Sequence, residues 1–368
     1  MDILQAKDFF LTKIILFLRK YEIRRLLSLN HEWTSYRQDW IYFQLNKSSS
    51  FRFYENNLFR ERILSLVRRP ISQLSLNLLL RSEMLLNNSI ISYVHSIKLS
   101  SSDCFNYRHI IDLSLFCHLG FLRIENCQVI NFHLPKNIEH ITLKNCVTES
   151  RIQLSPNYCP IWKFISCASI AVLELHPSII HIDIYNSPDF TSLLDNQTIK
   201  ELGLYNVRSF EFIELQYFCL LTSLTISCET LSTIPSLPFG LKHLFLFDCF
   251  ELRDLPKLPS LTLLWIRSCN KLTEISGFPE LRLLKLFYSK IHAIKNLLNL
   301  KKIELLKCCF LQTISNCPNL NYLKMETCPQ LNLREQDFPV LKKIEFFKRG
   351  FHSFEQYFQY RQALLVNG

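Results

Sequence analysis

The residues of this chain best suited to chemistry are its 14 cysteines and 11 histidines. No two cysteines have C-x-x-C spacing, so neither a zinc ribbon nor a thioredoxin-type redox motif is predicted. The vicinal pair Cys308 and Cys309 is the only redox-like arrangement, and we favour a packing role for it. The histidines are scattered and form no H-E-x-x-H motif. We therefore expect no metal site, no cofactor and no enzymatic activity.

Composition excludes several further classes of function. The chain has 368 residues, of which 48% are hydrophobic and 20% charged, as in soluble globular proteins. Its six glycines form neither a dinucleotide-binding G-x-G-x-x-G nor a P-loop. The most apolar early stretch, 9–18, contains Lys13 and is too short to span a membrane, which takes about 20 residues. With no signal-peptide pattern at the start, we expect a cytoplasmic protein, with the nucleus as the alternative.

A repeat of about 20 residues organises most of the chain. Its pattern is L-x-x-L-x-L-x-x-C, with other aliphatic or aromatic residues allowed, as in Leu241-Leu244-Leu246-Cys249 and Leu261-Leu264-Ile266-Cys269. Matching units start at 71, 94, 119, 138, 159, 179, 199, 221, 241, 261, 281, 300, 320 and 341. A constant spacing over so many units is the signature of a solenoid.

This pattern resembles the leucine-rich repeat family. The resemblance implies an α+β solenoid over 71–349, with short parallel strands on the concave face and extended or 3₁₀ segments on the convex side. The first 70 residues are predicted to form a small helical domain, and 350–368 a C-terminal capping helix. Cysteine or serine at the ninth position of most units is predicted to be a small buried residue that bonds to the turn backbone.

The N-terminal 70 residues do not follow the repeat. Apolar residues recur there at helical spacing, and the stretch 8–40 resembles an F-box. Phe9-Phe10 stands where that family usually has Leu-Pro. The resemblance implies docking on a Skp-type adaptor of a cullin-type ubiquitin ligase, through Ile14, Phe17, Leu18, Leu26, Leu29 and Trp33. The alternative is a helical cap that covers the open core of the first repeat.

Alternation along each strand predicts which residues face a partner. Counted from the start of each unit, positions three, five and seven point away from the core onto the concave face. Aromatic and basic residues gather there, as is typical of protein-binding hot spots. The predicted partner-binding residues are Tyr185, Tyr205, Phe245, Phe247, Trp265, Arg267, Lys285 and Phe287.

The chain carries a net charge of +10, with an excess of basic residues over 1–70 and over 281–349 and an acidic excess between them. Lysines and arginines outnumber acidic residues over 281–349, which could meet an acidic protein, an anionic membrane or nucleic acid. We favour a solvated lysine-rich face over these, and no nucleic-acid-reading module is recognisable.

The function predicted from the sequence is that of a monomeric interaction adaptor. It would be the substrate-recognition subunit of a cullin-type ubiquitin ligase, with its protein target on the concave face. The alternative is a stand-alone leucine-rich repeat binding protein, such as a sensor, an inhibitor or a pathogen effector.

Overall fold

The computed structural model describes residues 42–44, 73–79, 94–100, 108–113, 116–147, 151–153, 159–167, 170, 172–174, 176–194, 198–207, 215–346, 349–351, 355–357 and 359–360. The chain forms two compact units. The first unit comprises 1–100 and 116–120, and the second comprises 101–115 and 121–368.

The first unit contains three parallel strands, β1 (Tyr42–Gln44), β2 (Gln73–Leu79) and β3 (Val94–Ser100). Val94, Ile97 and Leu99 of β3 are buried. The helices predicted for 1–70 lie outside the described residues, as do the six predicted adaptor residues Ile14, Phe17, Leu18, Leu26, Leu29 and Trp33. The adaptor site and the alternative cap therefore both remain predictions.

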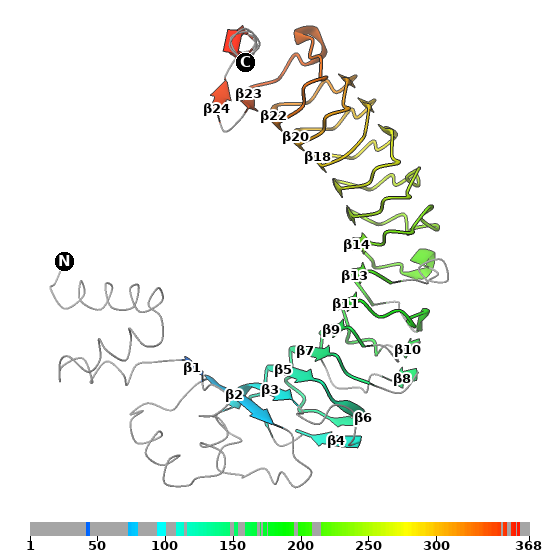
Figure 1. The fold of residues 1–368 in the computed structure, drawn as a ribbon, viewed down its shortest axis with the longest axis vertical. Coiled ribbons are helices and arrows are strands. Elements are labelled where there is room, and N and C mark those ends of the chain that lie inside the picture. The colour runs from blue at the N-terminus through cyan, green and yellow to red at the C-terminus, as the bar shows by residue number, and fades with distance from the viewer. Residues whose placement is uncertain are drawn as a thin grey trace, which may run out of the picture. The chain divides into compact units, whose positions relative to one another are not determined.

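The second unit is a stack of repeats whose strands form one long parallel sheet (Figure 1). In chain order these strands are β5 (Phe121–Glu125), β7 (His140–Lys144), β9 (Ile161–Ile165), β11 (His181–Tyr185), β13 (Glu201–Tyr205), β14 (Ser223–Ser227), β15 (His243–Phe247), β16 (Leu263–Arg267), β18 (Leu283–Phe287), β20 (Lys302–Leu306), β22 (Tyr322–Glu326) and β23 (Lys343–Phe346). Each begins two residues after a unit start that the repeat pattern predicts. The last strand, β24 (Arg349–Phe351), pairs antiparallel with β23.

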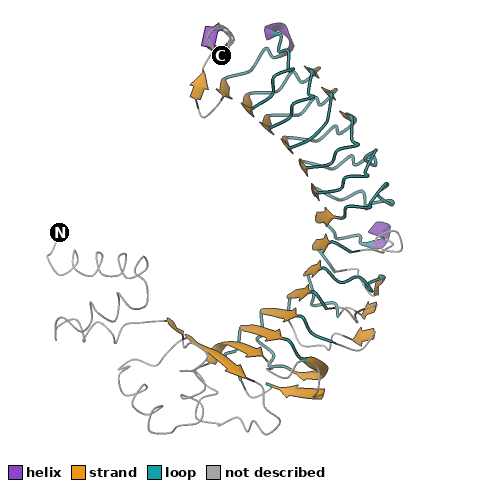
Figure 2. Ribbon diagram, viewed as in Figure 1, coloured by secondary structure: helices purple, strands orange, loops and turns teal. Residues whose placement is uncertain are grey.

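The other side of the second unit is made of loops and short elements (Figure 2). They are β4 (Arg108–Asp112) with β6 (Gln128–His133), β8 (Arg151–Gln153) with β10 (Val172–Glu174) and β12 (Ser192–Leu194), β17 (Glu274–Ile275) with β19 (Ala293–Lys295) and β21 (Thr313–Ser315), and the 3₁₀ turns η3 (Leu215–Tyr217) and η4 (Glu335–Asp337). This matches the predicted extended or 3₁₀ convex side. A solenoid of stacked parallel strands with so little helix is the architecture that the repeat pattern predicts.

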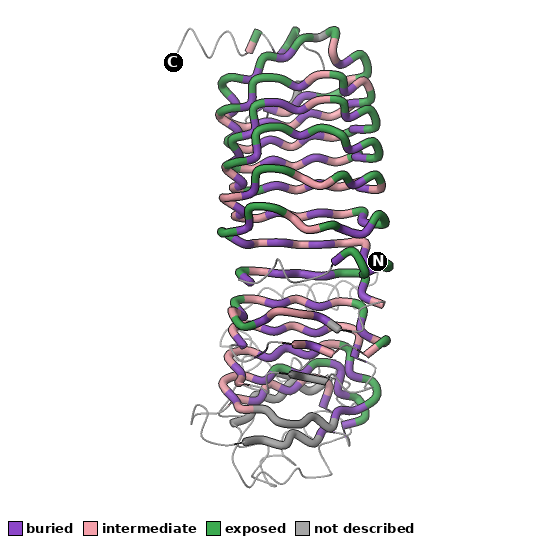
Figure 3. The backbone as a smooth tube through the Cα atoms, turned by 90° about the vertical axis from the view of Figure 1, so that its right-hand side faces the viewer, coloured by how far each residue is buried: buried purple, intermediate pink, exposed green. Residues whose placement is uncertain are grey.

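The core lies between the two sides and is built from the inward positions of every strand (Figure 3). Leu244 and Leu246 of β15 are fully buried, while Phe245 between them is only partly covered. The parallel register places Leu244 beside Leu264 and Leu246 beside Ile266. Repetition of this match from strand to strand produces continuous columns of buried aliphatic side chains, so each repeat completes its core only with its neighbours.

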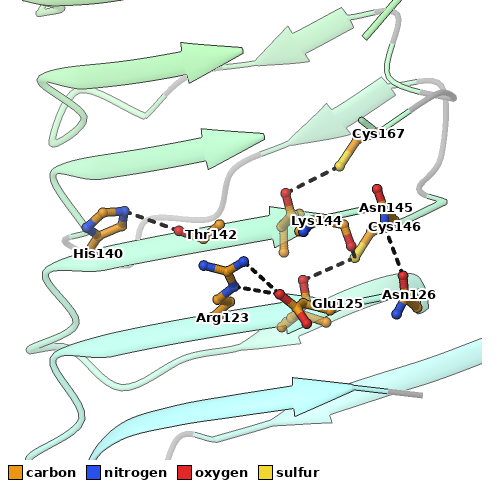
Figure 4. A network of polar contacts seen from close by, with 11 residues as sticks. Arg123, Glu125, Asn126, His140, Thr142, Lys144, Asn145, Cys146 and Cys167 are labelled. Carbon is orange, nitrogen blue, oxygen red and sulfur yellow. Dashed lines mark hydrogen bonds and ion pairs between the residues drawn. The ribbon is translucent and has the colours of Figure 1, made fainter. Parts of the chain in front are cut away.

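A tight turn ends the strands of the long sheet from β5 to β22 at position eight of the repeat, with the exception of β14. Residues there adopt positive φ, as at Asn126 (55°), Asn145 (50°) and Asn206 (53°), a conformation that asparagine tolerates better than most residues. The Asn145 backbone N–H donates to the Ile165 carbonyl of the next strand, at 2.8 Å. Its side-chain amide donates to Asn126 Oδ1 at 3.1 Å (Figure 4). Successive turns are thus hydrogen-bonded to one another, as successive strands are.

The predicted role of the ninth-position cysteines is confirmed. Cys146 is buried, and its thiol donates to the Ile124 carbonyl at 3.5 Å. Burial raises the pKa of Cys146 to about 12, so its thiol stays protonated at neutral pH. Cys228, which the pattern did not place, is buried one residue earlier in its unit and bonds to the Val207 carbonyl at 3.5 Å. The described cysteines form no disulfide.

The chain end was predicted to be a capping helix over 350–368. Residues 355–357 and 359–360 are helical, and Tyr357 is buried, with its ring 5.7 Å from that of Phe346. The first two residues of the predicted segment, 350 and 351, belong to strand β24 and not to a helix. The other residues of the segment lie outside the described ranges, so the extent of the helix stays a prediction.

One turn position has a residue poorly suited to its backbone. Thr327 has a φ of 57°, which is costly for a β-branched side chain. We expect Thr327→Asn to stabilise the protein by about 1 kcal/mol, because asparagine adopts this conformation with less strain. The measurement is the midpoint of urea unfolding. The control is Thr313→Asn, on an exposed strand position, which should give no gain. Equal shifts for the two variants would contradict the explanation.

Candidate protein-binding face

All eight predicted partner-binding residues occupy outward positions of the long sheet. They lie on β11, β13, β15, β16 and β18, in strands whose second and fourth residues are buried. The alternation predicted from the repeat is therefore confirmed for this part of the chain. The geometry and exposure of these side chains determine what kind of partner they suit.

Four rings of neighbouring strands form one group, which we call the aromatic cluster: Phe245, Phe247, Trp265 and Phe287. The ring centroid of Trp265 lies 5.3 Å from that of Phe247 and 5.5 Å from that of Phe287, in edge-to-face geometry. Phe245 completes the group at 6.1 Å from Trp265. These separations are those of favourable aromatic pairs, so the rings support one another while remaining partly accessible.

Two cations border the aromatic cluster and are held in place by neighbouring carboxylates. The Arg267 guanidinium lies 5.1 Å from the Phe247 ring centre and pairs with Asp248 at 2.8 Å. Lys285 Nζ lies 5.2 Å from the Trp265 ring centre and pairs with Glu304 at 3.1 Å. Each cation therefore lies over a ring of the cluster, in an orientation that is set in advance of binding.

The apolar surface extends further than the aromatic residues predicted. Leu263, Leu283 and Leu306 also occupy outward positions beside the cluster and are partly exposed. Sequence reasoning missed them because it searched for aromatic side chains. The sequence nevertheless indicates their location, because these leucines stand at positions three and seven, which the repeat assigns to the outer face. Trp265 Nε1 is buried here and has no hydrogen-bond partner among the described residues.

Tyr185 and Tyr205 do not belong to the aromatic cluster. Their rings stack on each other with centroids 4.0 Å apart and planes 3° from parallel. The strand β14 separates them from the cluster, since it pairs with β13 on one side and β15 on the other. Its outward residues are all small and hydroxylic: Ser223, Thr225 and Ser227. The predicted single patch is thus two groups with a polar strand between them.

The stacked tyrosines depend on a glycine beneath them. Gly203 is buried on β13, directly beside Asp183 in the register. A Cβ atom at this position would overlap Asp183 Oδ1 and come within 2.6 Å of Tyr205 Cε2. The absence of a side chain at this outward position therefore makes room for both neighbours.

A network of charged groups adjoins the tyrosines. His181 Nδ1 lies 2.9 Å from Glu201, and its Nε2 lies 3.3 Å from Asp183. Lys163 donates to the Tyr185 hydroxyl at 3.2 Å and pairs with Asp183 at 3.6 Å. The hydrogen bond to Asp183 raises the pKa of His181, against the opposing effect of burial. Burial lowers the pKa of His140, two strands away, and nearby Lys163 adds to this effect.

On the outward face of β18 to β23, three lysines have carboxylate partners, whereas Lys343 lies over the Tyr322 ring, 5.5 Å from its centre. Lys285 and Lys302 share Glu304, at 3.1 and 2.7 Å, and Lys324 pairs with Glu345 at 3.0 Å. Hydrogen bonds from Lys302 and Lys285 hold the pKa of Glu304 low although burial opposes this. These three lysines are therefore largely neutralised where they stand.

Elsewhere the described residues offer little for chemistry. No group of three or more His, Cys, Asp or Glu side chains in the described ranges is placed to hold a metal ion. A hollow of about 450 Å³ lies among the turns that follow the strands, lined by Arg253, Asp254, Asn270, Lys271, Thr273, Lys290, His292 and Phe310. Within the part of the chain that the structure covers, no helix is long and apolar enough to cross a bilayer.

Comparison with known proteins adds little to this picture. No family model and no curated protein matches the chain. Among solved structures, the leucine-rich repeat domain of the type III effector XopL aligns with 89% of this chain and 96% of its own, at 15% sequence identity and a TM-score of 0.25. A similarity with that score carries no argument, so the architecture described above rests on the strands and their register.

The two histidines are expected to titrate on opposite sides of the ordinary pKa of about 6.5. Measured by NMR, the midpoint should lie above that value for His181 and below it for His140, because the first contacts carboxylates and the second is buried beside Lys163. The stabilisation from protonated His181 is complete below about pH 6.5 and is lost as the pH rises through its folded pKa. His181→Gln should therefore cost stability at low pH and little at high pH. Equal midpoints for the two histidines would refute this assignment.

Proposed function

We propose that this protein is an interaction scaffold that binds a protein partner on the outward face of β14 to β20. Solenoids of stacked repeats typically bind proteins on their concave strand surface. The observation that carries the proposal is the aromatic cluster with its neighbouring leucines, which exposes apolar surface from the four adjacent strands β15, β16, β18 and β20. Monomeric soluble proteins rarely display contiguous apolar patches of this kind without a binding role.

The chemistry of the patch matches that of binding hot spots. Tryptophan and arginine are enriched at such sites, and both occur here beside phenylalanines that need no rearrangement to make contact. The paired cations Arg267 and Lys285 give the rim a charged character, which favours orientation of a partner over non-specific adhesion.

The aromatic cluster should dominate the binding energy. We expect the combined change Phe247→Ala, Trp265→Ala and Phe287→Ala to weaken partner binding by at least about 30-fold, the effect of one strong hot spot. The fold should persist, because all three side chains point away from the core, and circular dichroism would verify this. The control is Phe310→Ala, which removes an exposed ring in the turn after β20.

The partner for that measurement can be identified by photo-crosslinking. Benzoylphenylalanine placed at Phe247 should capture a protein that the same residue placed at Phe310 does not. The captured protein is then purified, and its Kd is measured against the wild type and the variants. Capture of the same proteins from both positions, or equal affinity for the triple variant, would refute binding on this face.

We propose, as the finer hypothesis, that the scaffold serves as the substrate-recognition subunit of a cullin-type ubiquitin ligase. Its support is the resemblance of 8–40 to an F-box, with Phe9-Phe10 in place of the usual Leu-Pro. The alternative, a stand-alone binding protein without a ligase connection, uses the same concave face and differs only in the role of the first 70 residues.

A direct binding test separates these two hypotheses. The full-length protein should bind a purified Skp-type adaptor, and the double change Leu18→Asp and Leu26→Asp should abolish that binding, because both residues belong to the predicted docking surface. Aromatic-cluster variants should bind the adaptor normally and serve as controls. Failure of the folded wild-type protein to bind would leave the stand-alone scaffold.

A further inference from the structure

A second surface of the solenoid follows from the residues that immediately precede the strands. Position two of each unit forms a continuous backbone ladder: Lys242 N–H donates to the Thr222 carbonyl at 2.9 Å, and Thr262 N–H donates to the Lys242 carbonyl at 2.8 Å. The same bond recurs along the row Ile180, Lys200, Thr222, Lys242, Thr262, Arg282, Lys301, Asn321 and Lys342. These residues are therefore direct neighbours along one edge of the sheet.

Five members of this row are cations: Lys200, Lys242, Arg282, Lys301 and Lys342. All five are exposed, and none forms an ion pair with a described residue. This contrasts with Arg267, Lys285, Lys302 and Lys324, each of which has a carboxylate partner. Seven strand spacings of about 4.8 Å place the five charges along roughly 34 Å of the edge. These five cations without a carboxylate partner are therefore arranged in a line.

Exposed apolar side chains stand in the turns that lead into the same row. Leu220, Phe239, Leu298 and Val340 each occupy the tip of such a turn. Phe239 is 80% exposed, far more than any ring of the aromatic cluster. The turn that carries it is closed by a bond from Leu241 N–H to the Pro238 carbonyl at 3.2 Å, which presents Phe239 on a fixed backbone. One carboxylate, Glu280, lies in an equivalent turn, so the surface keeps an excess of positive charge.

We propose that this basic flank, the five cations with the four apolar turn residues, binds the surface of an anionic phospholipid membrane. Cations near a bilayer are attracted to anionic headgroups, and exposed aromatic or aliphatic side chains enter the boundary between headgroups and acyl chains. Phe239 and its three companions are separate from one another rather than packed into a patch, which suits insertion into a lipid surface. Nucleic acid would use the cations for contacts with its phosphates, but the aliphatic tips Leu220, Leu298 and Val340 offer it no stacking platform.

The flank does not use the aromatic cluster, so membrane binding leaves the concave face available for a protein partner. The surface resembles that of a peripheral protein, which attaches through electrostatic attraction and shallow insertion rather than through a spanning helix.

The test is sedimentation of the full-length protein with vesicles. We expect binding to vesicles of phosphatidylcholine mixed with phosphatidylserine, little binding to phosphatidylcholine alone, and weakening as salt is added. The combined change Lys242→Glu, Arg282→Glu and Lys301→Glu should reduce the affinity by about 100-fold or more, since each basic residue near the surface contributes about fivefold. Phe239→Ala should lower binding and leave its salt dependence unchanged.

A matched control reverses as many charges elsewhere. Arg253→Glu, Lys290→Glu and Lys307→Glu lie in the turns that follow the strands, and Lys307 stands at the opposite end of β20 from Lys301. This variant should bind the vesicles within about threefold of the wild type. Equal losses for the two triple variants would overturn the flank as the binding surface. Absence of vesicle binding by the folded wild type, or preferential binding of duplex DNA that the flank variant abolishes, would overturn the membrane proposal.

Discussion

The structure depends on the burial of two aliphatic side chains per repeat between the repeats on either side. Within a single isolated unit, Leu244 and Leu246 would be exposed to water. They are fully buried because the equivalent residues of the two adjacent strands, Leu224 and Ile226 on one side and Leu264 and Ile266 on the other, pack against them. Burial of this kind favours a single register, because a shift of one residue would expose every inward side chain. The backbone ladders, the asparagine bonds and the buried thiols all require that register.

The same register creates the surfaces. Parallel strands without offset place equivalent positions of successive units side by side, so any residue type that recurs at one position becomes a row. Position five brings Phe245 next to Trp265 and Trp265 next to Lys285. Position two aligns the cations of the basic flank, and position nine aligns the buried cysteines. A change at one position is therefore felt mainly by the equivalent residues of adjacent repeats.

The two surfaces differ in how their charges are balanced. On the strand face the cations are opposed by carboxylates from the neighbouring strand, as with Lys324 and Glu345, and this ordering leaves the apolar residues as the main source of binding energy. Along the flank no carboxylate stands between the cations: Arg282 lies directly beside Lys301, and the intervening Thr222 and Thr262 donate their hydroxyls to backbone carbonyls. Thr222, for example, donates its hydroxyl to the Lys200 carbonyl at 3.2 Å. Positive charge thus accumulates along position two of the flank, because no acidic residue recurs at that position from Lys200 to Lys342.

Most of the second unit could be predicted from the repeat, because its spacing and the alternation of side chains are local properties of the chain. The strands, the inward leucines, the outward aromatic residues and the burial of the cysteines all follow from position within the unit. The division of the predicted patch by β14, and the pairing of Lys285 and Lys302 with one glutamate, could not be predicted in this way. Both features depend on which side chains face each other across adjacent strands. The distances between those side chains cannot be read from their spacing along the chain. The basic flank escaped notice for the same reason, since its members are about 20 to 40 residues apart and become a row only when the repeats stack.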